Sequence, residues 1–207
     1  VVEEVWFQGG PSTNHVVELD QADIDHFRFE ALVARLKECP LEVFHCTRPG
    51  PLVALHHHDS LDLALCNFVT RSRTLLSLAL AGGFQQELVC AVLRALAGCD
   101  ASIPLQHLDV SSNQLEDAGA LLAAAVVANT RIRLVALDVD NNATGWAGFQ
   151  ALAGAVQRTP DSALCDLNFQ HDLDRVVRGG TSKSVACLHA ASCVAAALGA
   201  NRLRRVR

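Results

Sequence analysis

The sequence lacks the features that define several large classes of protein. No stretch approaches the roughly twenty apolar residues that a membrane-spanning helix needs. No charged start is followed by an apolar run and a cleavage site, as in a secretory signal peptide. The pairs Gly82-Gly83 and Gly179-Gly180 stand outside any phosphate-binding glycine motif. A formal net charge of -5 gives no general attraction for phosphate. We therefore expect a cytoplasmic protein whose partners are proteins rather than membranes or nucleic acids.

The eight cysteines include no Cys-x-x-Cys pair. Most lie among apolar neighbours, as in LVCAVL around Cys90, which is typical of small core residues in a reducing compartment. Cys46 beside His45 and Cys187 near His189 come closest to a nucleophile and its base, but packing explains both pairs better. We therefore expect no active site and no cofactor. The chain begins with valine rather than methionine, as a piece of a longer protein would.

One segment of the sequence occurs in two similar copies. Residues 105–126 (LQHLDVSSNQLEDAGALLAAAV) and 134–156 (LVALDVDNNATGWAGFQALAGAV) align without gaps, apolar on apolar, with Asn113 on Asn142. Half of the 207 residues are hydrophobic, so the chain can bury a substantial core. The duplication indicates a structural repeat.

The strand part of this repeat, L-x-x-L-x-L in outline, recurs along the chain. Five copies begin at positions 41, 75, 105, 134 and 164, which are 34, 30, 29 and 30 residues apart. This period lies at or just above the long end of the range of leucine-rich repeats. The longest step contains Pro49-Gly50-Pro51 and His56-His57-His58, which we interpret as an inserted loop. Before the first copy we expect short strands at 2–7 and 16–19 and an amphipathic helix from Asp25, its N-cap there or at Asp23, to Pro40.

A single such unit cannot bury its own apolar face, so neighbouring units must stack. The pattern predicts an α/β solenoid, a horseshoe of about six repeats with a parallel sheet on the concave face and helices on the convex face. Asn113 and Asn142 fit the turn after each strand, and Gly119 and Gly148 fit positions where a side chain would crowd the strand. The helical residues expected to cover the core are Ala118, Leu121, Leu122, Ala125 and Val126.

We expect one domain over residues 1–207. Residues 1–40 form an irregular N-terminal repeat or cap, 41–172 the repeats, and 173–207 a C-terminal cap helix with a basic tail. The period is lost after Phe169, a loop is predicted over 171–174, and the cap helix over 184–198. The tail, predicted to be solvated, carries Arg202, Arg204, Arg205 and Arg207.

Residues 105–123 resemble the leucine-rich repeats of the ribonuclease-inhibitor type. More distantly, residues 105–198 resemble the C-terminal repeats of the CARMIL family of actin capping-protein regulators. The resemblance implies a role in the cytoskeleton. The segment by which that family engages capping protein lies outside its repeats, and nothing in this sequence matches it.

The concave face is the predicted binding surface. Strand alternation places nine residues there, and four of them are aspartates, which suggests a strip for a basic partner. An aspartate after the second leucine is also ordinary for this repeat class, so a structural role is the alternative. The nine residues are His107, Asp109, Ser111, Ala136, Asp138, Asp140, Asp166, Asn168 and Gln170.

Three other features have a functional and a plain interpretation. Trp146 could anchor a neighbouring chain or pack against the adjacent repeat. The run from His56 to Asp59 contains side chains that bind metal ions. Consecutive residues rarely converge on one ion, so we expect a solvated loop without metal. The arginine tail could bind an acidic surface or remain solvated.

These patterns predict a non-catalytic scaffold that binds proteins. We expect a structural or adaptor subunit of a larger hetero-oligomeric assembly, cytoskeletal or axonemal. One alternative is a GTPase-activating repeat protein of the RanGAP kind, although such proteins typically carry an acidic tail and this chain ends in arginines. Another is a substrate-receptor adaptor of a ubiquitin ligase, which would need a helical module upstream.

Overall fold

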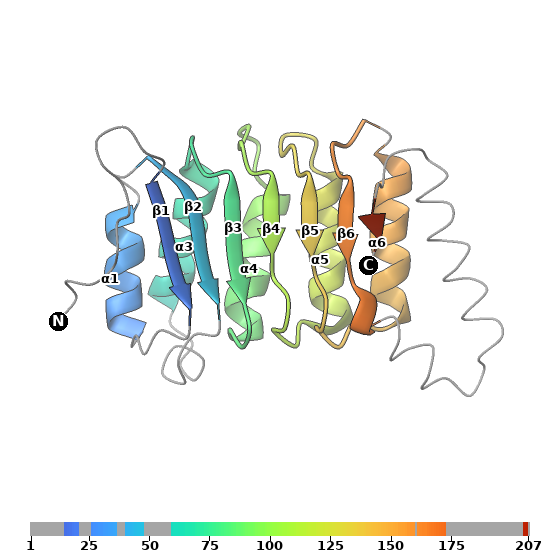
Figure 1. The fold of residues 1–207 in the computed structure, drawn as a ribbon, viewed down its shortest axis with the longest axis horizontal. Coiled ribbons are helices and arrows are strands. Elements are labelled where there is room, and N and C mark those ends of the chain that lie inside the picture. The colour runs from blue at the N-terminus through green and yellow to red at the C-terminus, as the bar shows by residue number, and fades with distance from the viewer. Residues whose placement is uncertain are drawn as a thin grey trace.

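The computed structural model describes residues 15–20, 26–36, 40–47, 59–159, 161–172 and 205–206. Within them, seven strands form one parallel sheet whose spatial order is the order of the chain (Figure 1). The strands are β1 (His15–Asp20), β2 (Leu41–Thr47), β3 (Ser77–Ala81), β4 (His107–Asp109), β5 (Ala136–Asp138), β6 (Asp166–Asn168) and β7 (Arg205–Val206).

From β1 to β6 a helix connects each strand to the next and lies behind one face of the sheet, and no element among the described residues covers the other face (Figure 1). We call this uncovered side the open face. The helices are α1 (His26–Leu36), α3 (Asp59–Arg71), α4 (Gln86–Ala97), α5 (Glu116–Ala128) and α6 (Trp146–Arg158). This confirms the predicted alternation of strands and helices around a parallel sheet, the arrangement of an α/β repeat solenoid.

The repeated leucines form a ladder through the core. Leu78, Leu108, Leu137 and Leu167 are paired in register across β3 to β6, and each is at most 2% exposed. The leucines that open the repeats, including Leu105 and Leu134, are buried as well. The same residue at the same place in each unit therefore packs against its own copy in the next unit, which fixes the strand register.

The predicted face of α5 was wrong. Leu121 is 52% exposed and Ala118 and Ala125 are exposed, while the buried side includes Ala123 and Val127. Of the expected set, only Val126 is buried and Leu122 is half-buried. The reason is that EDAGALLAAAVVA is apolar on all sides beyond its first turn, so the sequence contains no polar stripe that would orient the helix.

The recurring glycines are required by helix packing rather than by the strand. A Cβ on Gly119 would lie 2.3 Å from the Cβ of Leu115, in the turn that precedes α5. A Cβ on Gly148 would lie 2.6 Å from the Cβ of Ala120 on the neighbouring helix and 2.6 Å from Thr144 Cγ2. The repeat therefore uses glycine where α6 meets α5 and where each helix meets its own entry turn.

Two features at the end of the repeats differ from the sequence pattern. Residues 171 and 172 are helical, where the pattern suggested a loop. Within the arginine tail, Arg205–Val206 forms β7 and pairs with Asp166 and Leu167 of β6, a strand that was not predicted. A strand of two residues has no periodicity of its own, and its partner is almost forty residues away, so no local signal could have revealed it.

Several predictions lie outside the described residues. These are the strand at 2–7, the N-cap at Asp23 or Asp25, the loop containing the three histidines, and the cap helix at 184–198. In the part of the chain that is described, none of the helices combines the length and apolar character that crossing a membrane requires.

Candidate protein-binding face

The strand register arranges the polar residues of the open face in two rows, because residues paired in a parallel sheet point to the same side. The first row follows Glu18, His45, Ala79, Asp109, Asp138 and Asn168 from β1 to β6. The second row follows Val43, Ser77, His107, Ala136 and Asp166 from β2 to β6. The structure thus brings together six of the nine predicted residues: His107, Asp109, Ala136, Asp138, Asp166 and Asn168.

A hollow of about 310 Å³ opens on this face. Two of its lining residues, Ala79 and Ala136, have small side chains. Asp109, Asp138 and Asp166 also line it, together with His107. The hollow is therefore small and acidic, which suits the end of one long cationic side chain.

The aspartates that follow the buried strand leucines also support their own chain. Asp109 Oδ1 accepts a hydrogen bond from the backbone N–H of Ser111 (2.9 Å), and Asp138 Oδ1 accepts one from Asp140 N–H (2.9 Å). Asn168 Oδ1 receives the corresponding bond from Gln170 N–H (3.5 Å). These turns give the consensus aspartate a structural role. One oxygen of each carboxylate is used in this way, so a bound cation would meet Asp109 at its other oxygen and Asp138 at oxygens that already accept hydrogen bonds.

Asp138 is the most perturbed carboxyl group on the face. Burial raises the pKa of Asp138, and the charges of Asp109 and Asp140 raise it further. The N–H of Asp140 and the side chain of Asn168 oppose this rise in pKa by donating hydrogen bonds, the latter to Asp138 Oδ2 at 2.8 Å. The charge of Asp138 is thus incompletely compensated within the chain, and a cation placed in the hollow would stabilise it.

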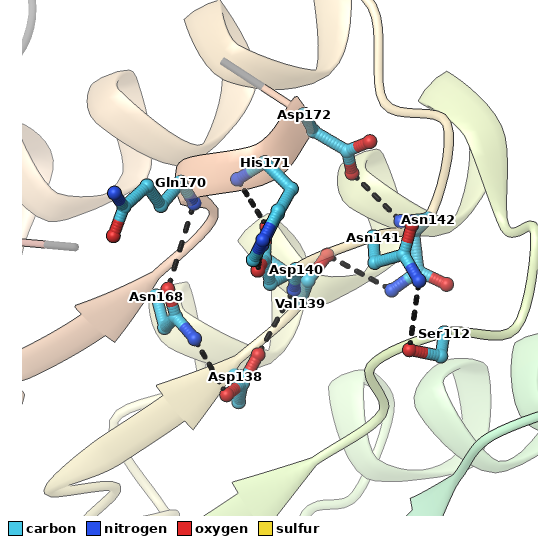
Figure 2. Close-up of polar contacts among 10 residues, drawn as sticks. All are labelled: Ser112, Asp138, Val139, Asp140, Asn141, Asn142, Asn168, Gln170, His171 and Asp172. Atoms are coloured by element: carbon cyan, nitrogen blue, oxygen red, sulfur yellow. Dashed lines mark hydrogen bonds and ion pairs between the residues drawn. The ribbon is translucent and has the colours of Figure 1, made fainter. Parts of the chain in front are cut away.

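Asp140 does not face the hollow with Asp138, as strand alternation had suggested. It lies beyond the end of β5 and is only 7% exposed. Figure 2 shows its carboxylate directed at His171: Oδ1 accepts the backbone N–H of His171 (2.7 Å), and Oδ2 is 2.5 Å from His171 Nδ1. Asp140 therefore ties the β5 turn to the helical residues after β6, while the His171 ring remains 79% exposed.

Ser111 and Gln170 also lie past the strand ends. Ser111 lines a second hollow of about 230 Å³ at the edge of the sheet where the strands end. Its other lining residues are Ser112, Asp138, Asp140, Asn141, Asn168 and His171. Gln170 is exposed. The nine predicted residues thus fall into two groups. Six lie on the sheet surface, and Ser111, Asp140 and Gln170 lie past the ends of the strands.

Sequence reasoning missed two polar contacts at the N-terminal end of the open face. His45 Nε2 is 2.7 Å from Ser77 Oγ, and His45 Nδ1 is 3.8 Å from Glu18 Oε1. The signal was present, because His45 and Ser77 align with Asp109 and His107 in the repeat. The outward-facing pattern of β4, β5 and β6 therefore extends to β2 and β3.

The remaining predictions can be placed individually. Trp146, the first residue of α6, packs against the core with its ring partly buried, and its role as an anchor stays a prediction. Cys46 is fully buried and faces away from His45, its neighbour in β2. Burial raises the pKa of the Cys46 thiol to about 12. The described part of the chain contains no group of three or more His, Cys, Asp or Glu side chains arranged to hold a metal ion.

The fold and this face define a repeat protein with an open parallel sheet that carries an acidic hollow. No protein-family model matches the chain, and no curated protein matches it closely enough to be a relative.

Proposed function

We propose that the protein is a non-catalytic scaffold that binds a basic segment of a partner protein on its open face. In this proposal the chain is a leucine-rich-repeat horseshoe, and the open face is its concave side. The observation that carries the proposal is the hollow of about 310 Å³ whose lining includes Asp109, Asp138 and Asp166. A lysine or arginine side chain fits its size, and the carboxylates supply charge-assisted hydrogen bonds.

The proposal extends to the cellular role. We place the protein in the cytoplasm as an adaptor or structural subunit of a larger assembly, with the cytoskeleton as the setting that the sequence resemblance favours. A rigid sheet held by a continuous leucine core suits such a role, because a preorganised surface loses little conformational entropy when a partner binds.

A binding assay with defined peptides tests the first part. The probe is a fluorescein-labelled peptide of twelve residues that alternates lysine and leucine, and binding is followed by fluorescence anisotropy. The triple variant Asp109→Asn, Asp138→Asn, Asp166→Asn should weaken binding about tenfold or more, with a smaller salt dependence than the parent chain. Glu116→Gln, an exposed position at the start of α5, is the control and should leave binding unchanged.

Affinity purification from the source cells tests the second part. The parent chain should recover cytoskeletal or axonemal proteins, and the triple variant should lose them. If the parent chain and the triple variant recover the same proteins, the open face is not the surface that binds them. Stimulation of GTP hydrolysis by a recovered small GTPase would replace the scaffold role with GTPase activation.

A further inference from the structure

Between positions 59 and 172, positive charge is confined to one edge of the sheet. Between positions 59 and 172 the basic residues are six arginines and no lysine. All six lie where a helix ends or in the connection to the next strand: Arg71, Arg73, Arg94, Arg131, Arg133 and Arg158. We call this set the arginine edge. The strands run toward the lower side of Figure 1, so the helix-to-strand connections that carry it follow the upper side.

Acidic residues concentrate at the opposite edge. Glu87, Glu116 and Asp117 lie in the first turns of their helices, and Asp140 and Asp172 follow strands. Asp100 and Asp161 are the acidic residues in the helix-to-strand connections between positions 72 and 165. A chain with a formal net charge of -5 therefore presents a predominantly cationic edge.

Helix dipoles explain only part of this arrangement. A cation in the last turn of a helix interacts favourably with the dipole, and Arg71, Arg94 and Arg158 occupy such positions. Arg73, Arg131 and Arg133 lie beyond the helices in the connections, and Arg131 and Arg133 are exposed. Their accumulation along one line favours a function in recognition.

Two cavities open along this edge, and each combines arginines with hydroxyl groups and an apolar wall. The first, of about 740 Å³, is lined by Arg71, Arg73, Ser72 and Thr74, with Leu36 and Phe68 on its apolar side. The second, of about 350 Å³, is lined by Arg133, Arg158, Thr159 and Ser162, with Val127 and Ile132 on its apolar side. Asp161 also lines the second cavity, where the two arginines outnumber it.

We propose that the arginine edge is a docking surface for an extended segment of a partner protein in which acidic and apolar residues alternate. Guanidinium groups and hydroxyls donate hydrogen bonds to carboxylates, and the apolar walls accept the residues between them. A nucleic acid fits less well, because the acidic open face and the negative net charge oppose a long polyanion. The open face and the arginine edge would then hold two partners of opposite charge.

The spacing of the two cavities sets the length of the segment. They are separated by three helix steps, since α3 contacts α4, α4 contacts α5 and α5 contacts α6. Packed helices lie about 8–10 Å apart, so the span is about 24–30 Å. An extended chain advances about 3.3 Å per residue, so about seven to nine residues reach from one cavity to the other.

Fluorescence anisotropy with three labelled probes tests the proposal on the full 207-residue chain. The probes are a twelve-residue peptide alternating glutamate and leucine, a four-residue version of it, and a twelve-nucleotide single-stranded uridine RNA. The long peptide should bind at least about tenfold more tightly than the short one, because only it reaches both cavities. Its binding should weaken with added salt.

Paired variants locate the binding. Arg71→Gln with Arg73→Gln, and Arg133→Gln with Arg158→Gln, should each weaken binding of the long peptide about fivefold or more. The matched control Asp109→Asn with Asp138→Asn should leave it unchanged, which separates this test from that of the open face. Circular dichroism spectra identical to that of the parent chain establish that each variant is folded. The proposal is overturned if the long peptide does not bind, or if neither pair of arginine substitutions weakens its binding. It is also overturned if the RNA binds more tightly than the long peptide.

Discussion

Asp172 Oδ2 accepts a hydrogen bond from the backbone N–H of Asn142 (2.7 Å), and Asn142 Oδ1 accepts the equivalent bond from Asn113 N–H (2.8 Å). Asp172 therefore occupies the asparagine position of the next repeat, thirty residues on. Figure 2 shows the last contact of this ladder at the end of the described repeats. A carboxylate can replace the accepting half of the amide here, although it cannot donate to carbonyl groups as the Asn142 amide does to Val110 and Val139.

Asn142 should contribute more to stability than its exposed neighbour. Its side chain accepts hydrogen bonds from Asn113 N–H and Leu115 N–H and donates to the carbonyls of Val110 and Val139, all in the buried interior. Asn142→Ala leaves these groups unsatisfied, and we expect the free energy of unfolding to fall by on the order of 3 kcal/mol. Urea denaturation measures the loss.

The control for this prediction is Asn141→Gly. Asn141 is exposed and has φ 54°, a left-handed conformation that glycine adopts freely. Its side-chain contact is a hydrogen bond to Ser112 Oγ (3.1 Å). We expect a loss below about 1 kcal/mol. Similar losses for both variants would mean that the asparagine ladder is not a major source of stability.

The same substitution at two leucines tests the packing of strand and helix. Leu137 is 2% exposed in β5, and Leu137→Ala should cost about 2–5 kcal/mol through lost burial and a cavity. Leu121 is 52% exposed on α5, and Leu121→Ala should cost less than about 1 kcal/mol. Thermal and urea unfolding both report the difference. A larger loss at Leu121 would show that the sequence-based orientation of α5 was right after all.

Two glycine-to-alanine substitutions in α6 should change the stability of the protein in opposite directions. Gly148→Ala forces a Cβ to 2.6 Å from that of Ala120, which is attached to a packed backbone, and should destabilise the protein by about 1–3 kcal/mol. Gly154→Ala meets the Nη1 of Arg158 at 2.8 Å, the end of a flexible side chain that can move. Because alanine favours helix over glycine, Gly154→Ala should stabilise by about 0.5–1 kcal/mol. Two losses of equal size would refute the proposed packing of α6 on α5.

The stability difference between Asp138→Asn and the parent chain should depend on pH. Because burial raises the folded-state pKa of Asp138 above its ordinary value of 3.8, the folded state binds the proton more tightly than the unfolded state. Asp138 therefore contributes to the stability of the folded state when the pH is below its ordinary pKa. This contribution is lost as the pH rises through the pKa that Asp138 has in the folded state. Relative to the parent chain, Asp138→Asn should gain stability between acidic and neutral pH. Urea midpoints measured from pH 3 to 7 that stay parallel would contradict this prediction.

Cys46 should be the slowest of the described cysteines to react with iodoacetamide in the native protein. With its pKa raised to about 12 by burial, its thiolate fraction at pH 8 is on the order of one in ten thousand. Cys99 and Cys165 are only half-buried and should be modified first. Mass spectrometry after timed quenching gives the order, and denaturant should abolish it. Early modification of Cys46 in the folded chain would mean that the strand β2 opens readily.

Sequence alone predicted the framework because the residues that build it repeat. Leu108 and Leu137 recur at the same place in each unit. Because each side chain packs against its own copy in the next unit, the leucines recur in the sequence at a fixed spacing. The spacing of these copies gave the strand order and the parallel sheet. Asn113 and Asn142 were found in the same way, and the structure supplied their partners.

Part of the candidate face followed from the same logic. Alternation placed Asp109, Asp138 and Asp166 on one side of the sheet, where the structure has them. It failed at Asp140, because alternation ends where the strand ends, and β5 stops at Asp138. The hydrogen bond between Asp140 and His171 joins residues 31 positions apart, and no local pattern encodes it.

The chain by itself thus determined the repeat, its period and the residues that point inward, because these depend on local alternation and on identical neighbours. Tertiary structure alone decided the orientation of α5, whose alanine-rich sequence is apolar on nearly every side. It also decided the pairing of Arg205–Val206 with β6 and the alignment of six arginines along one edge. Such features depend on which distant segments become neighbours, and only the stacked units bring them together.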